Sequence, residues 1–111
     1  MRLKRTDEAL EELHRAAELD PGQARYAYVY AVGLHSAARV DDALAVLKES
    51  LARHPNDRDT LQGLMTFSRD SGDVSSAREY AERLARLAPA DPNLAGLIQE
   101  LRRQEKKPDA Q

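Results

Sequence analysis

The sequence lacks cysteine and tryptophan, and only one of its 111 residues is phenylalanine. Without cysteine there can be no disulfide, thiolate zinc site, covalently attached haem or thiol nucleophile. The absence leaves the redox compartment open, since cysteine-free proteins occur on both sides of a membrane. We expect the cytoplasm, with the periplasm as the alternative if the chain is part of a larger exported protein.

Long apolar runs and an excess of one charge are also missing. No run approaches the roughly 18 apolar residues that span a bilayer, and the basic start MRLKRTDEAL lacks the apolar core of a signal peptide. The net charge is −2, with both signs interspersed, which is unlike the basic footprint of a nucleic-acid binder. We therefore expect neither a membrane nor a nucleic-acid partner.

What the chain does contain is a repeat of 34 residues. Three prolines lie at this spacing: Pro21, Pro55 and Pro89. An alanine precedes each proline by the same interval: Ala9, Ala43 and Ala77. The aligned stretches TDEALEELHRAAELDP, VDDALAVLKESLARHP and VSSAREYAERLARLAP each carry apolar residues at helical spacing. The period and the pattern together predict pairs of amphipathic helices.

This repeat resembles the tetratricopeptide repeat (TPR) family, whose pattern is W-x2-L-G-x2-Y, then A-x3-F, then P. The alanine and proline positions match in all three copies over about residues 6–104. The W-L-G-Y positions of the first helix are occupied by Ala27, Tyr30, Ala31 and Leu34, then by Leu61, Leu64, Met65 and Ser68. The signature Trp and Gly are therefore absent, although the small and apolar character of these positions is kept.

The resemblance implies an all-α, right-handed superhelical stack of about two and a half repeats and a C-terminal capping helix. We expect one TPR-type domain over residues 1–105. Its parts are a lone second helix at 6–19, repeats at 24–54 and 58–88, and a capping helix at 92–105. Residues 106–111 are expected to form a disordered tail.

Several residues indicate where these helices begin and end. Thr6, Asp73 and Asp91 are suited to cap helix N-termini with a side-chain oxygen. Gly72 stands where a helix should end in a left-handed residue. The position one repeat earlier is Ala38, where that conformation costs about 1 kcal/mol, so we expect Ala38→Gly to be neutral or stabilising.

The stack begins halfway through a repeat, which leaves its first helix without a partner. We favour a fragment of a longer bacterial protein, since a solenoid needs capped ends. The run YAYVYAVGLHSAARVDDALAVL is similar to C-terminal TPR segments of large bacterial proteins. The alternatives are homo-oligomerisation through the uncapped N-terminal end and a structural role as a C-terminal appendage.

Catalytic and metal-binding patterns are missing. The sequence has no H-E-x-x-H, G-x-S-x-G or P-loop motif. Its three histidines have no carboxylates at metal-ligand spacing; we expect His14 to be solvated and His54 to end a helix. We therefore expect no enzyme, metal or cofactor, and a protein or peptide as the partner.

The TPR resemblance implies a peptide site on the concave face, which the first helix of each pair lines. The matching positions are Arg25, Tyr28, Val32, His35, Asp59, Gln62, Thr66, Arg69, Glu100 and Arg103. TPR domains that bind chaperone C-termini carry a Lys and Asn clamp here, but this sequence has Tyr28 and Val32 at those positions. We expect a peptide with one apolar anchor and an acidic group; the alternative is an ordinary solvated face on a spacer.

Three tyrosines alternate along the stretch ARYAYVYAVGLH. On a helix, Tyr26 and Tyr30 share one side while Tyr28 points away from them. We expect Tyr26 and Tyr30 to pack within the fold and Tyr28 to face the groove.

Overall fold

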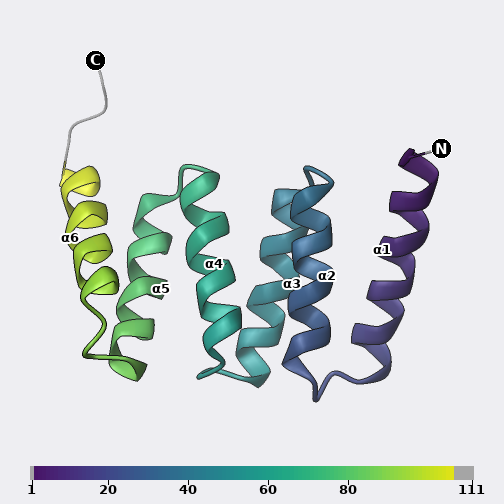
Figure 1. Cartoon of the computed structure of the whole chain (residues 1–111), viewed down its shortest axis with the longest axis horizontal. Helices are drawn as coiled ribbons and strands as arrows, with labels where there is room; N and C mark the ends of the chain where they lie inside the picture. The colour runs from purple at the N-terminus through teal and green to yellow at the C-terminus, as the bar shows by residue number, and fades with distance from the viewer. Residues whose placement is uncertain (1, 107–111) are drawn as a thin grey trace.

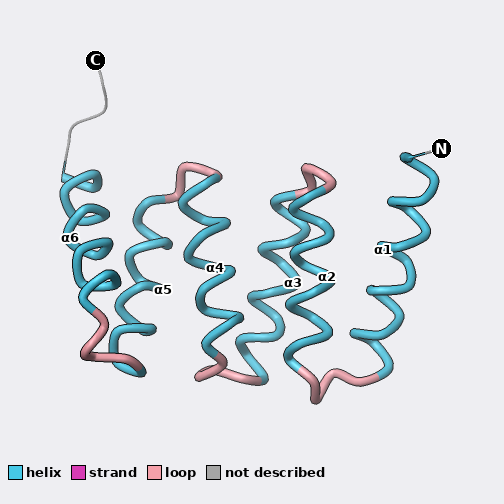
Figure 2. The backbone as a smooth tube through the Cα atoms, viewed as in Figure 1, coloured by secondary structure: helices cyan, strands magenta, loops and turns pink. Residues whose placement is uncertain are grey.

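The computed structural model describes residues 2–106, with side chains from residue 6 onward, and this part of the chain is all helix and loop (Figures 1 and 2). The helices are α1 (Arg2–Leu19), α2 (Ala24–Ser36), α3 (Val40–Arg53), α4 (Arg58–Asp70), α5 (Val74–Leu87) and α6 (Pro92–Lys106). Except for Lys106, which ends α6, the expected disordered tail lies outside the described residues.

Two of the three expected N-caps are confirmed. The carboxylate of Asp73 accepts a hydrogen bond from the backbone N–H of Ser76 at 3.1 Å. Asp91 caps α6 in the same way, accepting from the N–H of Asn93 at 3.0 Å. The third was wrong, because α1 begins at Arg2 and Thr6 lies inside it; the preceding Leu, Lys and Arg are good helix formers that extend the helix.

The turns inside the two repeats have the same backbone conformation. Gly72 has a φ of 89° and Ala38 a φ of 63°, so both occupy the left-handed region that the sequence predicts. After each turn, a backbone N–H reaches back to a carbonyl in the helix: Arg39 to Leu34, and Asp73 to Ser68. This is the pattern of a Schellman C-cap, which glycine adopts without strain and alanine does not.

Each complete repeat packs a first helix (α2, α4) against a second helix (α3, α5). Leucines fill the centre of the stack; those with essentially no exposure are Leu34, Leu47, Leu61, Leu64 and Leu101. Buried alanines on the second helices let neighbouring backbones approach closely. This stacking of helix pairs is the arrangement that the repeat pattern predicts.

The first helices α2 and α4 approach each other more closely than the second helices α3 and α5 do. α2 and α4 contact each other directly, whereas α3 and α5 do not. The side on which neighbours meet is the inner side of a curved stack. We call the side formed by the first helices α2, α4 and α6 the inner face, and the side formed by α1, α3 and α5 the outer face.

The two ends of the stack differ. Among the described helices, α1 contacts only α2, and it stands at one edge of the molecule (Figure 1). Ala9 is consequently exposed, although its equivalents Ala43 and Ala77 are fully buried. At the other end, α6 covers α5 with Leu94, Ile98 and Leu101 and turns polar residues outward, as a capping helix does.

Ion pairs hold α6 against α5. Arg102 donates to the carboxylate of Glu82 at 2.7 Å, while Arg78 donates to both Glu82 and Glu105. The Arg102 hydrogen bond holds the pKa of Glu82 below its ordinary value. The Arg78 hydrogen bond, with a second from Ser75, does the same for the pKa of Glu105.

Candidate inner-face site

The ten residues expected to line the groove lie on three first helices. Four are on α2 (Arg25, Tyr28, Val32, His35), four on α4 (Asp59, Gln62, Thr66, Arg69) and two on α6 (Glu100, Arg103). The direct contact of α2 with α4 brings the first two sets side by side. α6 does not contact α4, so its two residues stand apart from the others.

Two of the α2 residues are structural members of the α2–α4 interface. The ring of Tyr28 lies against the backbone of Gly63, where an added Cβ would be 3.4 Å from the Tyr28 Cε1. His35 stacks on Phe67 with ring centroids 4.1 Å apart, and its Nε2 is 3.5 Å from the Asp70 carboxylate. Tyr28 is therefore partly buried between helices rather than projecting freely from the inner face.

The more exposed residues of the set offer varied chemistry. Arg25, Asp59, Gln62 and Arg69 are polar and exposed, while Val32 is an apolar side chain that is 38% exposed. On α6, Glu100 and Arg103 form an ion pair one turn apart. The inner face is thus mixed, with charge of both signs and an isolated apolar position.

The expectation for Tyr26 was wrong, because this side chain is 43% exposed. Its equivalent one repeat later, Thr60, is fully buried in α4, which has α2 beside it. Within the described chain no first helix precedes α2, so no equivalent helix packs against Tyr26. Tyr30 does pack, by stacking on His14 with centroids 5.1 Å apart, and His14 is therefore not merely solvated.

The other histidine expectation is confirmed, since His54 is the C-cap residue of α3. Its Nε2 also lies 3.1 Å from the carbonyl oxygen of Pro21, in the loop between α1 and α2. The sequence pattern did not predict this second contact. It ties the N-terminal loop to the end of the first complete repeat.

A cleft of about 230 Å³ opens between α4 and α6. Apolar side chains form its walls: Met65, Leu84, Ala88, Leu94 and Leu97. Polar side chains surround them: Arg58, Gln62, Asp91 and Asn93. Of the ten expected groove residues, Gln62 lines this cleft. The sequence did not indicate the apolar wall residues as a site, because their spacing is also that of ordinary core residues.

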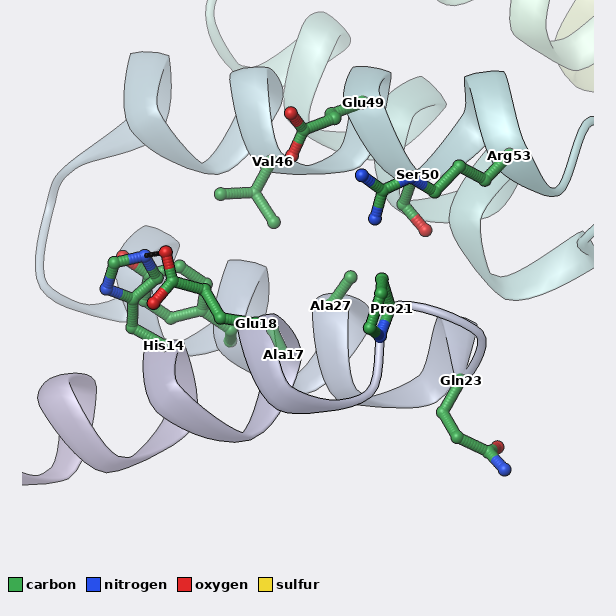
Figure 3. Close-up of a pocket in the computed structure, with 11 residues that line it drawn as sticks. His14, Ala17, Glu18, Pro21, Gln23, Ala27, Val46, Glu49, Ser50 and Arg53 are labelled. Carbon is green, nitrogen blue, oxygen red and sulfur yellow. Dashed lines mark ion pairs between the residues drawn. The ribbon is translucent and has the colours of Figure 1, made fainter.

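A larger cleft of about 400 Å³ lies between α1 and α3 on the outer face (Figure 3). Val46, Glu49 and Arg53 of α3 face α1 across it, and Ala27 of α2 forms part of its floor. His14 and Glu18 lie on the α1 side, 3.3 Å apart.

The repeat explains the depth of this outer cleft. Two of its residues, Ala17 and Val46, are replaced one repeat later by the larger Leu51 and Tyr80. Leu51 and Tyr80 line the equivalent cleft between α3 and α5. No residue of the first helix α4 reaches that cleft, whereas Ala27 of α2 lines the outer cleft. Comparing side-chain sizes 34 residues apart would have revealed the difference from the sequence.

The described residues contain no group of three or more His, Cys, Asp or Glu side chains placed to hold a metal ion. None of the described helices is both long and apolar enough to cross a membrane.

A family model described as tetratricopeptide repeat matches residues 34–101. The chain belongs to the TPR family. No curated protein sequence matches the chain.

The solved structures that are similar in fold include the following three. The Yersinia enterocolitica type III secretion chaperone SycD, in complex with a peptide of the translocator YopD, superposes with a TM-score of 0.78 at 9% identity, covering 95% of this chain and 86% of that one. The Sgt2 TPR domain from Aspergillus fumigatus gives 0.76 at 15% identity, covering 100% and 79%. PcrH, in complex with the chaperone-binding region of PopD, gives 0.67 at 18% identity, covering 93% and 77%.

Proposed function

We propose that this chain is a protein–protein interaction module that binds a peptide segment of a partner on its inner face. The observation that carries the proposal is the row of exposed side chains on α2 and α4, two helices joined by the Tyr28–Gly63 and His35–Phe67 contacts. A preformed surface loses little conformational entropy on binding. Two of the similar structures, SycD and PcrH, are complexes with a peptide or binding region of another protein, which supports the same class of activity.

The chemistry of the face suggests the form of the partner. Val32 can contact one apolar side chain, while Arg25 and Arg69 are exposed cations suited to an acidic group. The absence of the Lys and Asn clamp argues against recognition of a chaperone C-terminus. The partner segment would combine an apolar anchor with a nearby carboxylate.

The test is selection of ligands from a displayed random-peptide library, followed by calorimetric titration of the selected peptides. Gln62→Ala combined with Arg69→Ala on the inner face should weaken binding about tenfold or more. The matched control, Glu79→Ala combined with Arg86→Ala on the exposed surface of α5, should change the affinity less than about twofold. Loss of binding in the control pair alone would contradict the proposal.

A second candidate function is self-association through the N-terminal end. It is favoured by the exposure of Ala9 on α1, together with Leu19 at 80% and Tyr26 at 43%. Clusters of exposed apolar side chains commonly mark interfaces. Sedimentation equilibrium of the whole chain tests this candidate: a monomer up to millimolar concentration would exclude it, whereas a dimer that Ala9→Glu dissociates would support it.

A further inference from the structure

The cleft between α4 and α6 is the repeat equivalent of a space that is already occupied between α2 and α4. The positions one repeat, or 34 residues, after Tyr28 and Gly63 are Gln62 and Leu97. In the α2–α4 interface the Tyr28 ring lies against Gly63 and is packed on the core. In the α4–α6 interface the corresponding residues, Gln62 and Leu97, instead line an open cleft.

Residue size explains why one space is filled and the other is open. Gly63 has no side chain, and a Cβ there would lie 2.9 Å from the Leu47 Cδ1 of α3 and 3.4 Å from the Tyr28 Cε1 of α2. The small Gly63 and its neighbour Thr60 leave room for the Tyr28 ring where α4 contacts α2. On α6, leucines replace both residues, at positions 94 and 97, and α6 does not contact α4. Gln62 is exposed and places no ring in the space that this separation leaves.

We propose that this cleft accepts one phenylalanine or tyrosine side chain of a bound peptide, in the place that Tyr28 fills one repeat earlier. The inference rests on the proposed function, because it identifies the apolar anchor of the inner-face ligand. The cleft continues the α2–α4 interface along the same face, so a peptide crossing α2 and α4 reaches it next.

The chemistry of the cleft suits an aromatic ring. Met65, which is only 4% exposed, brings a thioether to the wall, and methionine sulfur makes favourable contacts with aromatic rings. Arg58 is held at the rim by its hydrogen bond to the carbonyl of Leu87 at 3.0 Å. A guanidinium there complements the negative face of a ring.

Met65 also provides a direct measurement, because Met1 is the only other methionine in the sequence. The whole chain, labelled with methyl-¹³C-methionine, is titrated with N-acetyl-phenylalaninamide and N-acetyl-tyrosinamide. We expect a saturable upfield ring-current shift of the Met65 methyl signal with a dissociation constant of about 1–10 mM, as befits so small a ligand. N-acetyl-leucinamide should bind at least about threefold more weakly, since it lacks the ring-specific contacts.

The decisive variant is Gln62→Tyr, which restores at this position the residue found one repeat earlier. Its own ring should enter the cleft, so that the Met65 methyl signal is shifted upfield without any probe and the response to the probes is lost. Glu79→Tyr, on the exposed surface of α5, is the matched control and should retain the full response. A circular dichroism melt shows whether both variants are folded.

Three results would each overturn the inference: no saturable shift with either aromatic amide, equal affinity for the leucine amide, or an unchanged response in folded Gln62→Tyr. These results are separable from the proposed function, because the amides probe the cleft without any peptide partner. Peptides that bind the inner face without an aromatic anchor would support the proposed function and contradict the cleft inference. A saturable response to the aromatic amides, together with failure to select any peptide that binds the inner face, would support the cleft inference and contradict the proposed function.

Discussion

The two ends of this stack differ in how completely the apolar side of the terminal helix is buried. At the C-terminal end, α6 buries Leu94, Ile98 and Leu101 and presents a polar outer surface. At the N-terminal end, α1 contacts a single one of the described helices, and Ala9 is open to solvent. Positions in phase therefore differ in environment because of their neighbours rather than their residue type. The same substitution should have very different effects at the two kinds of position.

The largest difference should follow from placing a charge at equivalent alanines. Ala43→Glu puts a carboxylate at a fully buried site and should lower the free energy of unfolding by about 4 kcal/mol or more, because an unpaired buried charge is poorly solvated. Ala9→Glu, at the exposed equivalent, should change it by less than about 0.5 kcal/mol. Urea denaturation followed by circular dichroism measures both. Similar losses in the two variants would mean that α1 is covered in solution.

A leucine truncation compares the packing of the terminal helices. Leu101 of α6 is fully buried, and Leu101→Ala should destabilise the fold by about 3 kcal/mol. Leu13 of α1 is only partly buried, so Leu13→Ala should lose about 1 kcal/mol, as less apolar area is re-exposed. The denaturation midpoints order the two variants, and a larger loss for Leu13 would contradict this view of the ends.

Acid should loosen the C-terminal end. Glu82 and Glu105 have pKa values below the ordinary 4.5 in the folded chain, so the folded state binds fewer protons than the unfolded state in acid. Their contribution to stability is complete above about pH 4.5 and is lost as the pH falls through the lowered pKa values. Hydrogen exchange of α6 should therefore accelerate, relative to α4, below that pH.

Arg102→Ala removes one partner from this cluster. Because Arg102 is a largely exposed side chain, the loss at neutral pH should be no more than about 1 kcal/mol, and the pH dependence of the α6 exchange should shrink. An acid response that is unchanged in Arg102→Ala would assign the effect to other carboxylates.

The sequence predicts those features that depend on position within the repeat. The 34-residue period indicated paired helices, and local chemistry indicated the caps at Asp73 and Asp91 and the left-handed Ala38. It did not predict the exposure of Tyr26, because helical periodicity says which side a residue faces and not whether another helix is present there. The α4–α6 cleft was missed for a related reason: its size depends on how closely Gly63 and Leu97 let neighbouring helices approach.

The smallest expected effect compares the turns of the two repeats. Ala38 and Gly72 share a left-handed conformation, which penalises a residue with a Cβ by about 1–2 kcal/mol, whereas glycine loses about 0.5–1 kcal/mol more backbone entropy on folding. Ala38→Gly should therefore leave the thermal midpoint unchanged or raise it, with a gain of at most about 1 kcal/mol in the free energy of unfolding. Gly72→Ala should lower the free energy of unfolding by a similar amount. An added Cβ at Gly72 meets no atom within 4 Å, so the loss comes from backbone strain and not from a clash. Calorimetry of both variants, with the double variant as a check on additivity, isolates this strain. A clear fall in the midpoint of Ala38→Gly would show that residue 38 is not left-handed in solution.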